Sequence, residues 1–94
     1  MLNVLSILPE IRFIKAGVTL PTELKLHFED VRREEDIIEA CQGMDFLFLP
    51  AAYPPITAYV LNRIPSVRMI QSAGAGYDQV DVESAAAVGI PVAN

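Results

Sequence analysis

Two glycines, Gly74 and Gly76, lie in the stretch of this sequence whose residue types could most directly do chemistry. The stretch covers residues 71–81 (QSAGAGYDQVD) and stands between an apolar, strand-like segment and a helix-like one. Open α/β folds bind their ligands at such strand-to-helix turns. Glycines there permit positive φ and leave the backbone bare, so that successive N–H groups can form a concave anion site. From the residues alone, a tight structural turn and a carboxylate-binding loop both remain open.

Nucleotide and phosphate-transfer motifs do not fit this stretch. A dinucleotide fingerprint requires a third glycine where the sequence has Gln79, and a P-loop requires a Gly-Lys-Ser/Thr that is absent. The predicted first and third strands end in Leu8-Pro9-Glu10 and Leu49-Pro50, which lack the acids of a phosphoacceptor receiver domain. The first of these turns also lacks the Ser/Thr-rich loop with which flavodoxins bind FMN. These classes of site are therefore excluded.

Metal chemistry has little support, because the chain contains one histidine and one cysteine. A zinc site needs three or four ligands, so no metal site is predicted. His27 falls in a predicted strand and is expected to be an ordinary strand residue. Cys41 follows Ile37 and Ile38 at helical spacing and is expected to be a small buried hydrophobe.

Short apolar segments alternate with helical patterns along the chain, which predicts a doubly wound parallel sheet with right-handed crossovers. The continuous apolar run 45–49 is typical of a strand covered on both faces, whereas the alternating run 24–28 is typical of a strand nearer the sheet edge. Thr57 and Asp81 are the expected helix N-caps. Strands are predicted over 2–8, 24–28, 45–49, 67–71 and 90–93, helices over 34–42, 58–63 and 82–88, and either a short helix or a loop over 10–17. We predict a flavodoxin-like α/β domain of about five strands.

The composition of 52% hydrophobic and 20% charged residues is that of a folded domain. A net charge of −5 argues against a nucleic-acid partner, and Arg32-Arg33 is followed at once by three acids, as at a solvated helix start. No apolar run approaches the roughly 18 residues that span a bilayer, and the N-terminus has no basic region typical of a secretory signal. We expect a cytoplasmic protein without a membrane partner.

Three blocks in the second half of the chain resemble the N-terminal, substrate-binding domain of the D-isomer-specific 2-hydroxyacid dehydrogenases. These blocks are residues 56–61 (ITAYVL), 67–81 (VRMIQSAGAGYDQVD) and 89–94 (GIPVAN). The family includes phosphoglycerate, glyoxylate/hydroxypyruvate and D-lactate dehydrogenases. The order and spacing of the blocks match over about residues 45–94, while residues 1–44 match only in the rhythm of strands and helices.

The resemblance implies a role for the glycine loop, because in that family its backbone amides hold the carboxylate of a 2-oxo or 2-hydroxy acid. By motif position the donors are the N–H groups of Ala75 and Gly76, and Gly74 shapes the turn. Some members place a basic or hydroxyl residue in the loop after the third strand, where Tyr53 is the polar candidate here; its alternative role is an aromatic that covers the sheet end. Ser72 stands where phosphoglycerate-type members often carry Arg, which argues against a phosphorylated substrate.

The resemblance also implies what residues 1–94 do not contain. In the family the NAD- or NADP-binding Rossmann domain and the catalytic Arg, Glu and His lie downstream of the matching region. We therefore expect residues 1–94 to be a truncated substrate-binding domain of an NAD- or NADP-dependent enzyme, with no catalytic, cofactor-binding or metal-binding residue of its own. The parent enzyme is expected to be a homodimer, and the fragment to expose an apolar patch that a later segment would cover. The alternative is a stand-alone, non-catalytic flavodoxin-like binding or scaffolding module.

Overall fold

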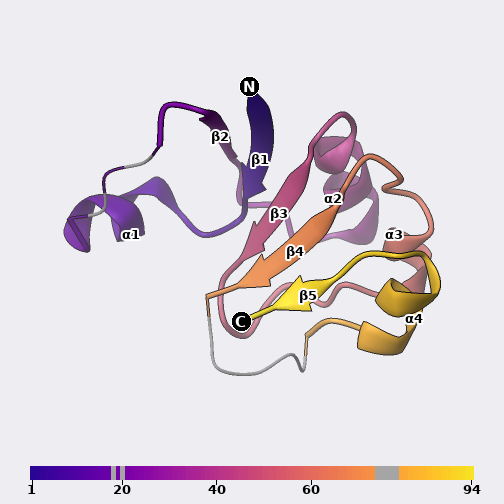
Figure 1. Ribbon diagram of the computed structural model, residues 1–94. Coiled ribbons are helices and arrows are strands. Elements are labelled where there is room, and N and C mark those ends of the chain that lie inside the picture. The colour runs from indigo at the N-terminus through magenta and orange to yellow at the C-terminus, as the bar shows by residue number, and fades with distance from the viewer. Residues whose placement is uncertain (18, 20, 74–78) are drawn as a thin grey trace.

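Five parallel strands form a single sheet, in the order β2-β1-β3-β4-β5, in the computed structural model of the chain (Figure 1). The structure describes residues 1–17, 19, 21–73 and 79–94. The strands are β1 (Leu2–Ser6), β2 (Leu24–Phe28), β3 (Phe46–Leu49), β4 (Met69–Ser72) and β5 (Val92–Ala93), and the helices are α1 (Glu10–Lys15), α2 (Glu34–Cys41), α3 (Ala58–Leu61) and α4 (Val82–Ala87). The predicted doubly wound fold is confirmed, and this strand order is that of the flavodoxins.

The main core lies between one face of the sheet and helices α2, α3 and α4. Leu5, Leu47 and Ile70 lie side by side in register on the three central strands and are fully buried. Ile37 from α2 and Val60 from α3 belong to the same buried cluster. Right-handed crossovers require this arrangement, because every connection that moves from β2 toward β5 places its helix on the same face. Helix α1 connects in the opposite direction and stands apart from the other three (Figure 1).

Local signals in the sequence set the helix ends. The side chains of Thr57 and Asp81 accept hydrogen bonds from the backbone N–H groups of Val60 and Ser84, at 3.4 and 3.1 Å, so both predicted N-caps are confirmed. Helix α4 ends at Ala87, and Gly89, the second residue after it, has a φ of 77°. The N–H of this glycine donates to the carbonyl of Ala86, and the next N–H donates to that of Ala85, as in a Schellman motif.

The second face of the sheet is covered only in part, which corrects the prediction that β3 is buried on both sides. Leu47 and Leu49 are buried, but Phe46 and Phe48 are half-buried. Helix α1, which has no buried residue, contributes Phe13, whose ring packs edge-on against that of Phe48 at 5.5 Å between centroids. The apolar run indicated burial but could not indicate that one short helix would have to provide the cover.

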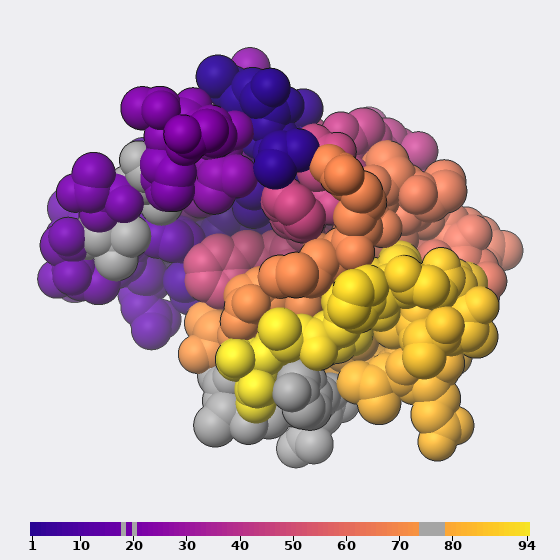
Figure 2. Space-filling model, viewed as in Figure 1, coloured from indigo at the N-terminus to yellow at the C-terminus, as the bar shows by residue number. Residues whose placement is uncertain are grey.

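An apolar hollow lies on this half-covered face of the sheet. Its walls include Phe46, Phe48 and Met69, with Leu24 and Val4 at its other side. In Figure 2, atoms of β3 (magenta) and β4 (orange) lie at the surface between the N-terminal segments and β5. At this hollow the apolar side chains of the second face are only partly covered by the described residues.

The two residues that could have suggested metal or thiol chemistry have structural roles. His27 lies on the edge strand β2, and its Nε2 is 3.1 Å from Oδ1 of Asn3 on β1. Cys41 is fully buried on α2, and burial raises the pKa of its thiol to about 12. The thiol is thus protonated at neutral pH and packs as an apolar group. Within the described residues, no group of three or more His, Cys, Asp or Glu side chains could hold a metal ion.

None of the helices that the structure describes is long and apolar enough to cross a membrane.

Candidate functional site

The loops that follow β3 and β4 are joined to each other at the carboxyl edge of the sheet. The N–H of Ala73 donates to the carbonyl of Leu49 at 2.9 Å, just before the glycine-rich segment. Just after it, the N–H of Ile56 donates to the carbonyl of Gln79 at 2.6 Å, and the N–H of Asp81 donates to the carbonyl of Ile56 at 3.0 Å. The residues that flank segment 74–78 are therefore hydrogen-bonded to the end of β3 and to the β3–α3 loop.

The predicted substrate-binding residues Gly74, Ala75 and Gly76 lie outside the described residues, as does Asp78. The structure fixes the residues on either side of them. Ser72, the last residue of β4, is buried with 1% of its surface exposed. The expected position of the segment, after a parallel strand and before the capped helix α4, agrees with the order of the described elements.

Tyr53, the fourth predicted site residue, is half-buried in the loop after β3. The guanidinium carbon of Arg32, from the loop after β2, lies 4.3 Å from the centre of the Tyr53 ring. Arg32 also donates from Nε to the carboxylate of Asp30 at 3.0 Å, and this hydrogen bond raises the pKa of the guanidinium. The structure thus brings two loops of the carboxyl edge into contact through a cation and an aromatic ring.

Arg32 is a residue that the sequence analysis assigned only to a solvated helix start. It is largely exposed, with 59% of its side chain accessible, as that interpretation expects. Its position over Tyr53 could have been suspected only from its place in the loop that follows β2, since the loops after parallel strands share one edge of the sheet.

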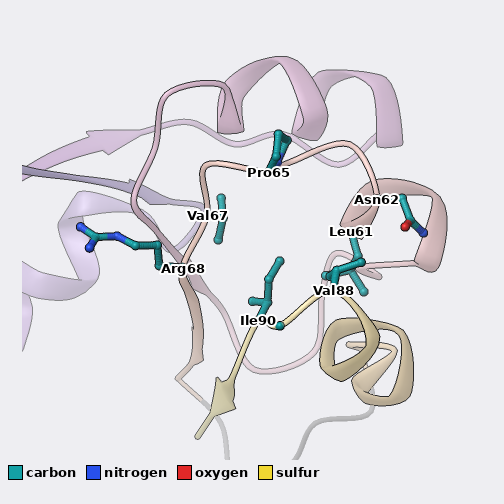
Figure 3. Close-up of a pocket in the computed structure, with 8 residues that line it drawn as sticks. Leu61, Asn62, Pro65, Val67, Arg68, Val88 and Ile90 are labelled. Carbon is teal, nitrogen blue, oxygen red and sulfur yellow. The ribbon is translucent and has the colours of Figure 1, made fainter.

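A hollow of about 380 Å³ lies at the opposite, amino edge of the sheet, between the C-terminal ends of α3 and α4 (Figure 3). Its polar side chains are committed to the chain itself. Asn62 donates to the carbonyl of Ala58 at 2.7 Å, and Arg68 pairs with Asp45 at 3.3 Å. The size of this hollow does not make it a site, because its lining offers an incoming ligand few uncommitted polar groups.

The model of the D-isomer specific 2-hydroxyacid dehydrogenase catalytic domain matches residues 4–94 of the chain. The chain belongs to this family. The match covers almost the whole sequence, including residues 4–44, for which the sequence motifs carried little signal.

Solved structures of dehydrogenases share the fold of this catalytic domain. The chain is similar to a phosphoglycerate oxidoreductase from Vibrio cholerae, with 20% identity and a TM-score of 0.77. The similarity covers 99% of this chain and 30% of that one. It is also similar to the NAD⁺-bound 3-phosphoglycerate dehydrogenase of Entamoeba histolytica (23%, TM-score 0.75, covering 97% of this chain and 32% of that one) and to the D-lactate dehydrogenase of Escherichia coli (17%, TM-score 0.74, covering 100% and 31%).

The chain thus spans about a third of the length of these structural relatives. No curated protein matches it significantly in sequence.

The sequence of the glycine-rich turn lacks the fingerprint that binds a nicotinamide dinucleotide. A dinucleotide fingerprint needs a glycine at position 79 for close packing of its helix on the sheet. Here Gln79 fills that position with a buried side chain, whose Nε2 donates to the carbonyl of Pro50. Position 79 thus carries a buried side chain where the fingerprint requires a glycine.

Proposed function

We propose that residues 1–94 form the substrate-binding domain of an NAD- or NADP-dependent D-2-hydroxyacid dehydrogenase, and that the amides of Ala75 and Gly76 bind the substrate carboxylate. The observation that carries the proposal is that the residues flanking segment 74–78 are hydrogen-bonded to the end of β3 and to the β3–α3 loop, at the edge of the sheet where open α/β folds bind ligands. Membership of the family supplies the chemical class of the ligand, a small 2-oxo or 2-hydroxy acid.

The proposed contacts are the N–H groups of Ala75 and Gly76, with Gly74 allowing the backbone to turn. A charge-assisted hydrogen bond contributes about 1.5–3 kcal/mol, so two of them give affinity only in the millimolar range. Tyr53 is the proposed further contact, in the loop to which the glycine-rich segment is tied. Tight binding of the substrate then depends on groups outside these 94 residues.

In this proposal the domain holds and orients the acid but does not move a hydride. The nicotinamide of NAD or NADP, when bound in the parent enzyme, supplies or accepts that hydride. A general acid must lie within hydrogen-bonding reach of the reacting oxygen, and His27 is not available for this because it lies on β2 beside Asn3. We place the cofactor-binding Rossmann domain and the catalytic side chains in a second domain, and the parent enzyme in the cytoplasm as a homodimer.

Activity measurements on two proteins test this division of labour. The purified 94-residue chain is expected to oxidise neither NADH nor NADPH in the presence of pyruvate, glyoxylate or hydroxypyruvate. A protein that also includes the downstream coding sequence is expected to oxidise one of the two cofactors and to form the D-hydroxy acid. Turnover by the homogeneous 94-residue chain would contradict the division. A coding sequence without a second glycine-rich βα turn and a later histidine would favour the stand-alone binding module.

A further inference from the structure

Helix α1 exposes two large apolar side chains, although isoleucine is among the residues most often buried. Ile11 and Ile14 have 50% and 65% of their surfaces exposed. They are three positions apart and are therefore neighbours on the helix surface. Phe13, which packs against two rings of the sheet, points from the other side of the helix. The helix projects from the rest of the molecule (Figure 1), so the two isoleucines have little to pack against among the described residues.

Charged side chains of opposite sign flank the two isoleucines. Glu10 is in the first turn of α1 and Lys15 in the last, and both are exposed. Neither forms an ion pair with another residue that the structure describes. Each charge suits the dipole of the helix, but that role does not account for the exposed isoleucines between them. We refer to Glu10, Ile11, Ile14 and Lys15 together as the α1 face.

The α1 face is complementary to itself. Successive residues of an α-helix are about 100° apart around its axis. Glu10 therefore lies on one flank of the isoleucines near the N-terminal end, and Lys15 lies on the other flank near the C-terminal end. A two-fold axis that passes between the isoleucines, perpendicular to the helix, exchanges both the ends and the flanks. It places Lys15 of a second copy opposite Glu10, and the reciprocal contact follows by symmetry.

We propose that the α1 face is a self-association surface, on which two copies of the chain pair with their α1 helices antiparallel. The isoleucines of one copy pack on those of the other, and two contacts between Glu10 and Lys15 flank them. A partner with charges of one sign would be attracted by one end of the face and repelled by the other, whereas a second copy matches both ends. The net charge of −5 per copy opposes association in general, so self-association needs a face with such matched charges. The inference does not depend on the proposed function.

The small size of the α1 face sets the strength of the contact. A stable interface buries about 800 Å² on each partner, which is more than a helix of six residues offers. The dimer is therefore expected to be weak and to form at protein concentrations of about 0.1 to 1 mM. Sedimentation equilibrium of the 94-residue chain over this range is expected to show a reversible monomer–dimer equilibrium. A chain that stays monomeric throughout would overturn the inference.

Charge exchange tests the antiparallel arrangement. Glu10→Lys and Lys15→Glu each place like charges opposite one another at two symmetric contacts, and each is expected to weaken the dimer about tenfold. Glu10→Lys also lowers the net negative charge, so general repulsion alone would predict stronger association. An equimolar mixture of the two variants restores opposite charges at both contacts and is expected to dimerise within about threefold of the wild type. A mixture that associates as weakly as the separate variants would overturn the inference.

Glu39→Lys is the matched control, because it makes the same change of charge at an exposed position of α2, on the other face of the sheet. This variant is expected to dimerise at least as well as the wild type. A loss as large as that of Glu10→Lys would show that the effect is not specific to α1. Dimerisation that Met69→Asp abolishes and the α1 variants leave unchanged would place the contact at the apolar hollow, and would also overturn the inference.

Discussion

Replacing Leu47 by alanine is expected to lower the free energy of unfolding by about 2–5 kcal/mol. Leu47 is fully buried in the middle of the sheet, between Leu5 on β1 and Ile70 on β4. Truncation leaves a cavity that rigid strands on both sides cannot close. A domain of this length is stabilised by only about 5–14 kcal/mol in total. Urea unfolding followed by circular dichroism would therefore show that the variant loses a large share of its free energy of unfolding. At the upper end of this range, much of the protein would be unfolded without urea.

Phe46→Ala is the matched control, because it alters the adjacent residue of the same strand on the opposite face. Phe46 is half-buried, and its ring faces Arg68 at 5.7 Å from the guanidinium carbon. The Phe46 ring therefore buries less apolar area than its size suggests. We expect Phe46→Ala to lower the free energy of unfolding by about 1–2 kcal/mol. A loss as large as that of Leu47→Ala would show that the second face is covered in solution, contrary to the one-sided core described above.

Replacing Ala75 by proline is expected to weaken binding of a small 2-oxo acid by about 10- to 150-fold. Proline has no N–H, so the substitution removes one of the two proposed donors. One charge-assisted bond of about 1.5–3 kcal/mol corresponds to that range of affinity. Since the wild-type affinity is itself expected to be millimolar, the variant should show no saturable binding of pyruvate by calorimetry or NMR titration at accessible concentrations.

The control at the same position is Ala75→Gly, which keeps the N–H and removes only a methyl group. It should bind pyruvate within about twofold of the wild type, because the flexibility it adds costs less than a hydrogen bond. Melting curves of both variants show whether the fold is retained. A folded Ala75→Pro protein that still bound pyruvate normally would assign the carboxylate to other donors.

The sheet was predictable because its signals are local and repeat. Each strand is a short apolar run, and each of the helices α3 and α4 carries its own cap, Thr57 or Asp81. Alternation of such elements leaves few topologies that obey right-handed crossovers. The ends of the strands were predicted less accurately than their presence. The first strand ends at Ser6 and not at residue 8, and there the Ser6 hydroxyl donates to the carbonyl of Leu8 instead of solvent.

Features that depend on distant partners were not predictable. Residues 10–17 fitted a helix or a loop equally well, because α1 buries no residue of its own and is held mainly through Phe13. The contact of Arg32 with Tyr53 joins loops that are 21 positions apart in sequence. The sequence analysis used Gln79 only to exclude a dinucleotide fingerprint, since nothing in a sequence shows that its side chain is buried and donates to the carbonyl of Pro50.

The proposed function requires that the backbone amides of Ala75 and Gly76 bind a carboxylate. The direct measurement is a ¹H–¹⁵N titration of the 94-residue chain with D-lactate and, separately, with D-lactamide, which has the same carbon skeleton without the negative charge. The account predicts saturable shifts of both amides with D-lactate in the millimolar range, and no such shifts with D-lactamide. Resonances that stay in place with D-lactate, or that move equally with both compounds, would contradict it.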